Sequence, residues 1–546
     1  MNYIKYFLIA IAGCILFLPF LGQAHLFDWD EINFAECARE MIVTKDYVRA
    51  QIDFMPFWEK PPVFIWMQVV AMKMFGIGDY AARFPNAVMG IATLLTLFYC
   101  GKKIINEKMG LWWAGLYAAT WLPHFYFKSG IIDPTFNFFI FLSFFQFHLI
   151  VFTGNKLRHA ILSGLFLGIA VLTKGPVAVL VAGLSLIVYM LANRGIKGFT
   201  VKHLLTVSLF ALVPFFMWIG FAVAVYGLHY GQWFLTEFLT YQVRLFTTED
   251  ADHGGPFIYH FIVLLIGCFP ASAFLFQFGR KDAGSSNAPA RDFTKLMWIM
   301  FWVVLILFSI VKTKIVHYSS LCYFPLTFLG ALQVYRLSEE GLIIKKLVKG
   351  VLLFIAALWA IILIALPLVG LNKEKIIPYI DDKFAVGNLE ADVPWHYAES
   401  LWGVLYITGI VAGIILIKKN FRQGILLMFA VQLVIIQVTI YHFTPKIEAY
   451  SQRAAIEYYE SFNGQDVYVT PLGYKSYANL FYTKKRNFAA PKYYLNGKVN
   501  EQWLLTGATD KPAFFIGKIQ NEADYDAIPQ LEKTGKKNGF VFYRRK

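Results

Sequence analysis

Long apolar runs separated by short polar segments dominate the first 443 residues of the chain. A helix needs about 20 apolar residues to cross a bilayer, and about thirteen runs approach that length. They lie near residues 3–22, 80–100, 109–127, 134–153, 160–173, 176–192, 204–226, 256–278, 296–311, 319–335, 348–370, 401–417 and 424–443. The pattern predicts an all-α polytopic membrane domain over residues 1–443, with the first run kept as a transmembrane helix.

The pattern changes in the last hundred or so residues. From residue 444 to residue 546 polar helical stretches alternate with short strand-like segments, at 466–470, 512–517 and 540–544. Alternation of apolar and polar residues over such short lengths is typical of half-buried strands. The sequence therefore predicts a small C-terminal α/β domain over residues 444–546.

Composition agrees with a membrane protein. Hydrophobic residues make up 58% of the chain and charged residues 16%, against about 45–50% and about 25% in soluble domains. The net charge of +15 would suit nucleic acid, but in so apolar a chain we assign it to loop lysines and arginines. We expect membrane lipids, and no nucleic acid, as partners.

The basic residues also orient the chain. They cluster in one set of alternate short loops. The clusters contain Lys102, Lys103 and Lys108, then Lys156 and Arg158, then Arg194, Lys197 and Lys202, and continue through residues 280–295, 336–349 and 418–422. By the positive-inside rule these loops are cytoplasmic. This places the N-terminus inside, and the first loop and C-terminal domain outside, on the periplasmic side of a bacterial inner membrane.

The first outer loop is rich in acids. Its segment 31–42 has the apolar spacing of an amphipathic helix lying at the membrane interface, with Asp30 and Glu31 at the start. An acid there would cap the helix and meet its positive end, so a structural role for Asp30 stays open. The loop also holds Cys37, the cysteine expected to report on its accessibility.

A second polar feature of this loop is the segment FWEKPP at residues 57–62. Two prolines hold Glu59 and Lys60 on a rigid, non-helical turn. A surface ion pair would explain the two residues equally well. A second amphipathic stretch, residues 63–76, follows the turn.

These motifs, with others further along, resemble the aminoarabinose transferase (ArnT-like) branch of the GT-C membrane glycosyltransferases, which is related to the protein O-mannosyltransferases. The resemblance covers about residues 25–335. It is carried by D-E-x-x-x-A-E-x-A-R-E-M (30–41), E-K-P-P (59–62), A-R-F-P (82–85), G-I-I-D-P-T (130–135), L-T-K-G-P (172–176), the segments 234–247 and 252–256, and S-I-V-K-T-K-I-V-H-Y (309–318).

The resemblance implies a site on the outer face. It implies catalytic roles for Asp30, Glu31 and Asp133. It implies that Lys60, Arg244, Lys174 and Lys314 meet the donor phosphate, where cations stabilise the leaving charge. Further candidates are His317, Tyr318 and Arg39; His317 departs from many relatives. Since Asp133, Lys174 and His317 stand at span ends, snorkelling to the interface remains an alternative for them.

Glu59 and His253 match positions that in ArnT-like proteins contribute to a bound divalent metal. Zinc accepts mixed oxygen and nitrogen ligands of this kind. Two residues do not make a metal site by themselves, so unrelated polar loop residues remain the alternative.

The resemblance implies a glycosyltransferase that takes a sugar from polyprenyl (undecaprenyl) phosphate. The sugar expected is 4-amino-4-deoxy-L-arabinose or a similar one, and the acceptor lipid A; we expect a monomer. The alternatives are O-mannosyl-like transfer to periplasmic proteins, a multispan transporter, and a structural membrane protein with a sensor tail. Transporters favour repeats and broken helices at the midplane, whereas the polar residues here gather at one face.

Overall fold

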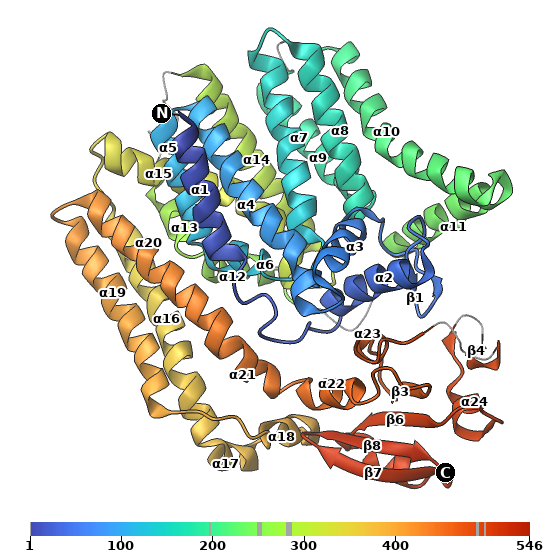
Figure 1. The fold of residues 1–546 in the computed structure, drawn as a ribbon. Coiled ribbons are helices and arrows are strands. Elements are labelled where there is room, and N and C mark those ends of the chain that lie inside the picture. Colours follow the sequence, from blue (N-terminus) through green and yellow to red (C-terminus); the bar gives the residue numbers. More distant parts are fainter. Residues whose placement is uncertain (1, 196–197, 248–253, 280–286, 487–490, 496–497) are drawn as a thin grey trace.

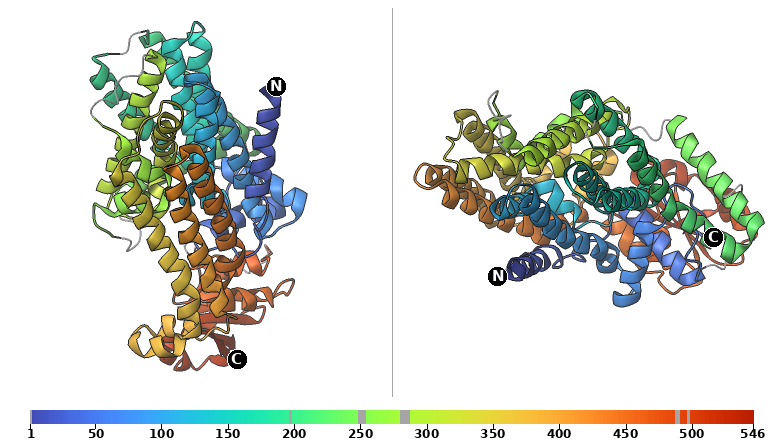
Figure 2. Two further views of the ribbon diagram at one scale, coloured as in Figure 1. Left: turned by 90° about the vertical axis from the view of Figure 1, so that its left-hand side faces the viewer. Right: turned by 90° about the horizontal axis from the view of Figure 1, so that it is seen from above.

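The computed structural model describes residues 2–195, 198–247, 254–279, 287–486, 491–495 and 498–546. Within them a bundle of long helices carries a small α/β domain at one end (Figure 1). The two termini lie at opposite ends of this arrangement, as Figure 2 also shows. That placement agrees with termini on opposite sides of a membrane.

The bundle contains most of the helices. They are α1 (Asn2–Phe17), α4 (Asp79–Ile104), α5 (Glu107–Ala118), α6 (Trp121–Tyr126), α7 (Asp133–Phe152), α8 (Lys156–Lys174), α9 (Val177–Asn193), α10 (Val201–Tyr226), α11 (Leu228–Thr247), α12 (Tyr259–Gly267), α13 (Ala271–Phe274), η1 (Leu275–Gln277), α14 (Ala288–Ile310), η2 (Val316–Cys322), α15 (Tyr323–Glu339), α16 (Lys346–Leu371), α19 (Leu401–Ile417), α20 (Phe421–Val438) and the π-helical turn η5 (Thr439–Phe443). Short helices between α16 and α19 are α17 (Lys373–Ile376), η3 (Ile377–Tyr379), α18 (Lys383–Leu389) and η4 (Tyr397–Ser400).

Eight of the described helices are long and apolar enough to cross a membrane, or nine if a helix pair bent by 103° over residues 259–277 counts as one span. The predicted polytopic helical domain is confirmed. The count of about thirteen spans stays a prediction, because the run near 109–127 is split into α5 and α6 and others are shorter than a span. Helix α10 exposes most of its apolar surface. Only 17% of its most apolar 18-residue stretch is buried, and it lies at the edge of the bundle in Figure 2.

The first loop folds into α2 (Asp30–Thr44), the two-residue strands β1 (Gln51–Ile52) and β2 (Met55–Pro56), and α3 (Val63–Phe75). The predicted amphipathic helix over residues 31–42 exists as α2. Every residue from Glu31 to Met41 is buried, because α3 and α4 pack on one side of α2 and the C-terminal domain on the other. Helix α2 therefore lies at the junction of the two parts of the molecule.

The C-terminal domain has the predicted α/β character. Its four-stranded sheet has the order β3-β6-β8-β7, with β3 and β6 parallel and the other pairs antiparallel. The elements are α21 (Thr444–Ala449), α22 (Arg453–Glu460), β3 (Tyr468–Leu472), α23 (Ala478–Tyr482), η6 (Pro491–Tyr493), β4 (Tyr494–Leu495), β5 (Lys498–Val499), α24 (Glu501–Thr506), β6 (Ala513–Lys518), η7 (Ile519–Asn521), α25 (Glu522–Asp526), β7 (Leu531–Lys537) and β8 (Phe540–Arg545). The three predicted strands correspond to β3, β6 and β8. The proposed boundary after residue 443 stays a prediction.

One apolar core joins this domain to the first loop. Ile32 and Met41 of α2 belong to the same buried cluster as Ile456, Ile516 and Phe542 of the C-terminal domain. Burial of large aliphatic and aromatic side chains contributes about 1.5–3 kcal/mol each. The domain is therefore held firmly against the loop that carries the predicted site.

Candidate active site

A cavity of about 750 Å³ lies where the first loop, the ends of several bundle helices and the C-terminal domain meet. Charged and titratable residues from widely separated segments line it. They are Asp28, Asp30, Glu59, Lys60, Asp133, Lys174, Lys314, His317 and Lys475. The fold thus brings together residues that are up to several hundred positions apart in the chain, and most of the predicted site residues are among them.

The deepest charged pair of the cavity is Asp133 with Lys174. Asp133 opens α7 ahead of a proline, which suits the first turn of a helix, and its carboxylate is near the positive helix end. Gly175, with a φ of +88°, ends α8 so that Lys174 is its last residue. The Lys174 Nζ lies 2.5 Å from Asp133 Oδ1, and the Ser320 hydroxyl donates to the same oxygen at 3.4 Å. Asp133 is only 2% exposed and is already neutralised.

Asp30 differs from Asp133 because its side chain is 39% exposed to the cavity. It is the first residue of α2, and no side chain caps that helix, so the capping role left open above is not what the structure shows. His317 Nε2 lies 3.4 Å from Asp30 Oδ2 and 3.9 Å from Asp133 Oδ2. His317 is therefore the link between the two carboxylates.

The protonation of His317 follows from its surroundings. Burial lowers the pKa of the imidazole below its ordinary value, and Lys174 and Lys60 add to this, although the carboxylates of Asp133 and Asp30 favour the charged form. Since the ordinary value is near 6.5, His317 is neutral at pH 7. A neutral ring can donate one hydrogen bond to Asp30 without cancelling its charge.

The predicted phosphate-binding cations have different settings. Lys60 lies on the cavity wall, 3.2 Å from Glu59. Lys174 is bound to Asp133, and its Nζ lies 5.4 Å from the centre of the Tyr318 ring. Lys314 donates to the carbonyls of Phe308, Ser309 and Val311 at 3.2, 2.7 and 2.5 Å. It satisfies carbonyls at the end of α14, which helix ends leave open. Lys314 also lines the cavity, and its predicted role at the donor phosphate stays a prediction.

Glu31 lies outside the cavity, and its predicted catalytic role stays a prediction. It is buried and does not line the cavity; its carboxylate accepts from the Arg83 guanidinium at 2.9 and 2.7 Å. It also accepts from the Gly130 amide at 2.5 Å. Burial would raise the pKa of Glu31, but Arg83 and these N–H groups together lower it. Glu31 therefore ties the first loop to α4 and to the turn before α7.

Arg39 also lies outside the cavity. Its guanidinium forms a two-pronged bond with Glu36 at 2.7 and 2.6 Å and donates to the Lys485 carbonyl at 2.8 Å. Arg39 is 1% exposed. It joins α2 to the C-terminal domain, and its predicted role as a site residue stays a prediction.

The two remaining predictions concern Arg244 and the metal. Arg244, on α11, is exposed and does not line the cavity, although Tyr241 one turn earlier does. Of the two predicted metal ligands, Glu59 lies on the cavity wall and His253 lies outside the described residues. Within the described part of the chain no three His, Cys, Asp or Glu side chains gather as a metal-binding group.

Sequence reasoning missed Lys475. It comes from the C-terminal domain, between β3 and α23, and lines the cavity beside Asp28 and Trp29. No motif surrounds it in the sequence, and only the docking of the tail on the first loop brings it to the site. The signal that could have suggested it is the aromatic setting in YKSY, residues 474–477.

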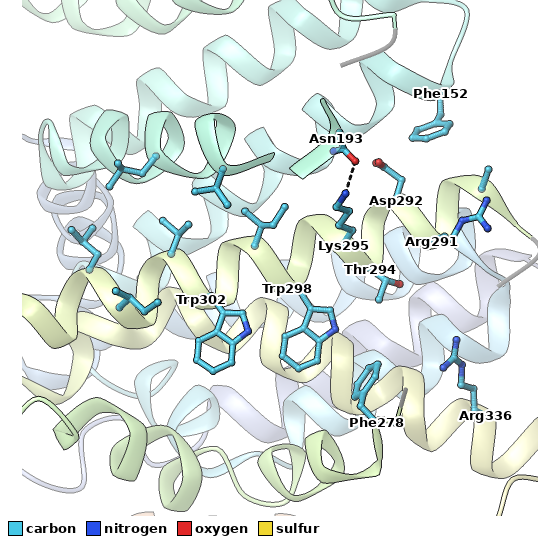
Figure 3. Close-up of a pocket in the computed structure, with 18 of the residues that line it drawn as sticks. Phe152, Asn193, Phe278, Arg291, Asp292, Thr294, Lys295, Trp298, Trp302 and Arg336 are labelled. Carbon is cyan, nitrogen blue, oxygen red and sulfur yellow. Dashed lines mark hydrogen bonds between the residues drawn. The ribbon is translucent and has the colours of Figure 1, made fainter. Parts of the chain in front are cut away.

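A second, larger cavity of about 1180 Å³ lies along α14, against α9 and the end of α7. Figure 3 shows Trp298 and Trp302 on its apolar stretch and Lys295 bound to Asn193 near Asp292. Asp292 accepts from the Tyr189 hydroxyl at 2.5 Å and bonds to His148 at 3.0 Å. Among the described residues that line this cavity, Asp292 is the single carboxylate and is already bound twice, so we do not take the cavity as the candidate active site.

Comparisons with known proteins agree with the resemblance seen in the motifs. A family model described as dolichyl-phosphate-mannose-protein mannosyltransferase matches residues 59–219. Undecaprenyl phosphate-alpha-4-amino-4-deoxy-L-arabinose arabinosyl transferase of Wigglesworthia glossinidia brevipalpis is 26% identical over 359 residues, 64% of this chain and 61% of that protein. Its counterpart in Edwardsiella ictaluri is 26% identical over 62% of this chain and 59% of that protein. The match thus spans about three fifths of these relatives' length.

The fold is similar over nearly the whole chain. The crystal structure of ArnT from Cupriavidus metallidurans bound to undecaprenyl phosphate superposes with a TM-score of 0.76 and covers 98% of this chain and 97% of that one, at 16% identity. The apo form of the same protein gives the same TM-score and covers 100% of this chain. The predicted resemblance to the ArnT-like branch is confirmed, and the chain has the GT-C fold of ArnT, including the last third that carries no recognisable motif.

Proposed function

We propose that this chain is an integral-membrane glycosyltransferase that moves a sugar from a polyprenyl (undecaprenyl) phosphate to an acceptor on the outer face of the membrane. One observation carries the proposal: an exposed carboxylate, Asp30, shares a cavity with a cation, Lys60, at the end of the helix bundle where the C-terminal domain sits. A lipid-linked donor needs its reactive phosphate at such a boundary, because its tail stays in the bilayer.

The reaction breaks the bond between the anomeric carbon and the donor phosphate oxygen and forms a bond from that carbon to an acceptor oxygen. The transition state resembles an oxocarbenium ion, and negative charge grows on the leaving phosphate. Lys60 lies partly exposed on the cavity wall beside Glu59, and it stabilises that charge. The bonding pair leaves with the polyprenyl phosphate.

Asp30 acts at the acceptor. A hydroxyl acceptor gives its proton to the Asp30 carboxylate as the new bond forms. An acceptor that is itself a phosphate is already ionised, and Asp30 then stabilises the positive charge of the sugar. The Asp133–Lys174 bond joins the start of α7 to the end of α8, and neutral His317 orients Asp30 without protonating it.

We infer a sugar related to 4-amino-4-deoxy-L-arabinose and lipid A as acceptor. The names of the relatives support this sugar, and the undecaprenyl phosphate bound to the similar ArnT structure supports the carrier. The family model over residues 59–219, named for protein mannosyl transfer, supports protein acceptors as the second candidate. Mass spectrometry of a deletion strain separates them: lipid A loses a sugar-sized mass under the first, and periplasmic glycoproteins shrink under the second.

We propose that the chain lies in the bacterial inner membrane with the site and C-terminal domain in the periplasm. Four of the five natural cysteines, including Cys37, are buried, and the fifth, Cys14, lies in α1. Because Cys14 is exposed, introduced cysteines report cleanly in a Cys14→Ala background. A membrane-impermeant thiol reagent added to intact spheroplasts should label Lys536→Cys and spare Arg194→Cys; the opposite pattern would reverse the orientation.

A divalent metal at this site stays a proposal. Glu59 lies on the cavity wall, and Gly254, the residue after His253, bridges to Thr313 on the same wall. Such a metal would add positive charge near the leaving phosphate. Elemental analysis of the purified protein, with Glu59→Gln as the matched variant, tests it: a stoichiometric metal lost in the variant supports the site, and a metal-free protein removes it.

A further inference from the structure

The loop of residues 473–477 in the C-terminal domain contributes Lys475 to the wall of the cavity that Asp30 also lines. Several bonds dock this domain on the first loop. The Asp28 amide donates to Gln452 Oε1 at 3.2 Å, and Gln452 Nε2 donates to the Leu26 carbonyl at 2.6 Å. The rings of Trp29 and Tyr477 meet edge to face at 6.2 Å. The loop is therefore held in place relative to Asp30.

Lys475 is the cation that this loop presents to the cavity. Its Nζ lies 4.4 Å from the centre of the Trp29 ring and 5.2 Å from that of Tyr477. Aromatic faces attract a cation and orient it, but they carry no net charge to neutralise it. Asp28, an acid in the same wall, accepts from Ser476 and from the Tyr477 amide, and the positive charge of Lys475 also favours its ionised form.

The other cavity lysines are bound differently. Lys60 pairs with Glu59, Lys174 with Asp133, and Lys314 with backbone carbonyls. Among the described residues Lys475 forms no ion pair within 4.0 Å; its ammonium group lies over two aromatic rings and interacts with the Asp28 charge from further away. Such a group can take an anion without first breaking an ion pair.

We propose that Lys475 binds a phosphate group of the acceptor, so that the C-terminal domain forms the acceptor side of the cavity and selects anionic acceptors. This rests on the proposed function. Position distinguishes the two substrates. Lys60 directly precedes Pro61, Pro62 and the apolar helix α3, whose Val70 and Met74 are exposed, so it lies on the side that a lipid tail reaches. Lys475 belongs to the domain at the end of the bundle (Figure 1), which the proposed orientation places in water.

The first test is steady-state kinetics of the full-length protein in nanodiscs. The donor is undecaprenyl phosphate 4-amino-4-deoxy-L-arabinose, and the acceptor is lipid A with or without its phosphate groups. Lys475→Ala should raise the KM for phosphorylated lipid A about tenfold, the scale of one charge-assisted bond, with kcat little changed. Lys475→Arg should restore the KM. An unchanged KM in Lys475→Ala overturns the inference.

Lys518→Ala is the matched control. Lys518, in the same domain, also rests on aromatic rings, 4.7 Å from Phe384 and 5.2 Å from Tyr474, but it does not line the cavity. It should leave the KM unchanged. If Lys518→Ala raises the KM as much as Lys475→Ala, the effect comes from the domain's overall charge, and the assigned site is wrong.

Direct binding separates this inference from the proposed function. Wild type and Lys475→Ala are titrated with phosphorylated lipid A, with dephosphorylated lipid A and with undecaprenyl phosphate, without turnover. The inference predicts weaker binding of phosphorylated lipid A alone. Loss of undecaprenyl phosphate binding would assign Lys475 to the donor and overturn it. A wild type that binds as predicted but transfers no sugar refutes the proposed function and leaves the Lys475 site standing.

Discussion

The two large cavities of this protein differ in how their charges are used. The outer cavity holds an exposed carboxylate, Asp30, beside a neutralised one, Asp133, and cations that come from separate parts of the fold. The cavity along α14 is larger, about 1180 Å³ against about 750 Å³, yet the one acid among its described lining residues, Asp292, is bonded to Tyr189 and His148. Cavity volume therefore does not identify the reactive site in this protein. A carboxylate that a substrate can reach is the better indicator.

The largest effect is expected from Asp30. Asn keeps the size of Asp30 and removes its charge, so Asp30→Asn should fold normally while turnover falls by about two orders of magnitude or more, the scale of acid–base roles. Turnover per folded protein is the measurement. A well-folded Asp30→Asn protein with near-normal turnover would remove Asp30 from the mechanism and, with it, the distinction between the cavities.

Lys174→Met should have the next largest effect, mainly on stability. It leaves Asp133, 2% exposed, without its ionic partner, and breaking a buried pair in this way costs about 3–5 kcal/mol of folding free energy. The melting temperature should fall clearly. The double variant Asp133→Asn with Lys174→Met should recover most of the lost stability, because no buried charge remains. A Lys174→Met protein as stable as wild type would contradict the Asp133–Lys174 pairing.

His317→Gln should change the pH dependence of stability. The lowered pKa of His317 means that below about pH 6.5 the unfolded chain binds a proton that the folded protein refuses. Stability therefore falls as the pH falls through this range. Gln cannot titrate, so between pH 7 and pH 5.5 the melting temperature should drop less in His317→Gln than in wild type. Parallel curves would show that His317 titrates normally.

The smallest effect is expected in the α14 cavity. Asp292→Asn keeps hydrogen-bonding capacity toward Tyr189 and His148, so turnover should stay within about twofold of wild type, and stability should change by about 1 kcal/mol, the size of one hydrogen bond. This variant is the matched control for Asp30→Asn, since each removes one carboxylate charge from a cavity wall. A large loss of turnover would mean that the two cavities are coupled.

Local motifs predicted much of the outer site. Asp30, Lys60 and Lys174 stand in short, recognisable segments at span ends or on a proline-rich turn. In the structure all three line the same cavity. Their partners were not predictable in this way. The Lys174–Asp133 bond and the position of His317 between two acids depend on how α7, α8 and η2 pack, which no spacing in the sequence encodes.

The docking of the C-terminal domain accounts for the features that the sequence pattern did not predict. The domain covers α2, so the segment expected at the membrane interface is buried, and Cys37, expected to report on an accessible loop, is 0% exposed. Its Lys485 carbonyl accepts a hydrogen bond from Arg39, and its Lys475 lines the cavity. The sequence predicts the strands of this domain from their apolar alternation, but contacts between segments over four hundred residues apart have no local pattern.

The central claim is tested most directly by transfer of a labelled sugar from undecaprenyl phosphate to lipid A by the purified protein. Wild type, Asp30→Asn and Asp292→Asn are compared at equal amounts of folded protein. The structure predicts transfer by wild type and Asp292→Asn, and almost none by Asp30→Asn. Equal transfer by all three, or a loss confined to Asp292→Asn, would contradict the assignment of the reaction to the outer cavity.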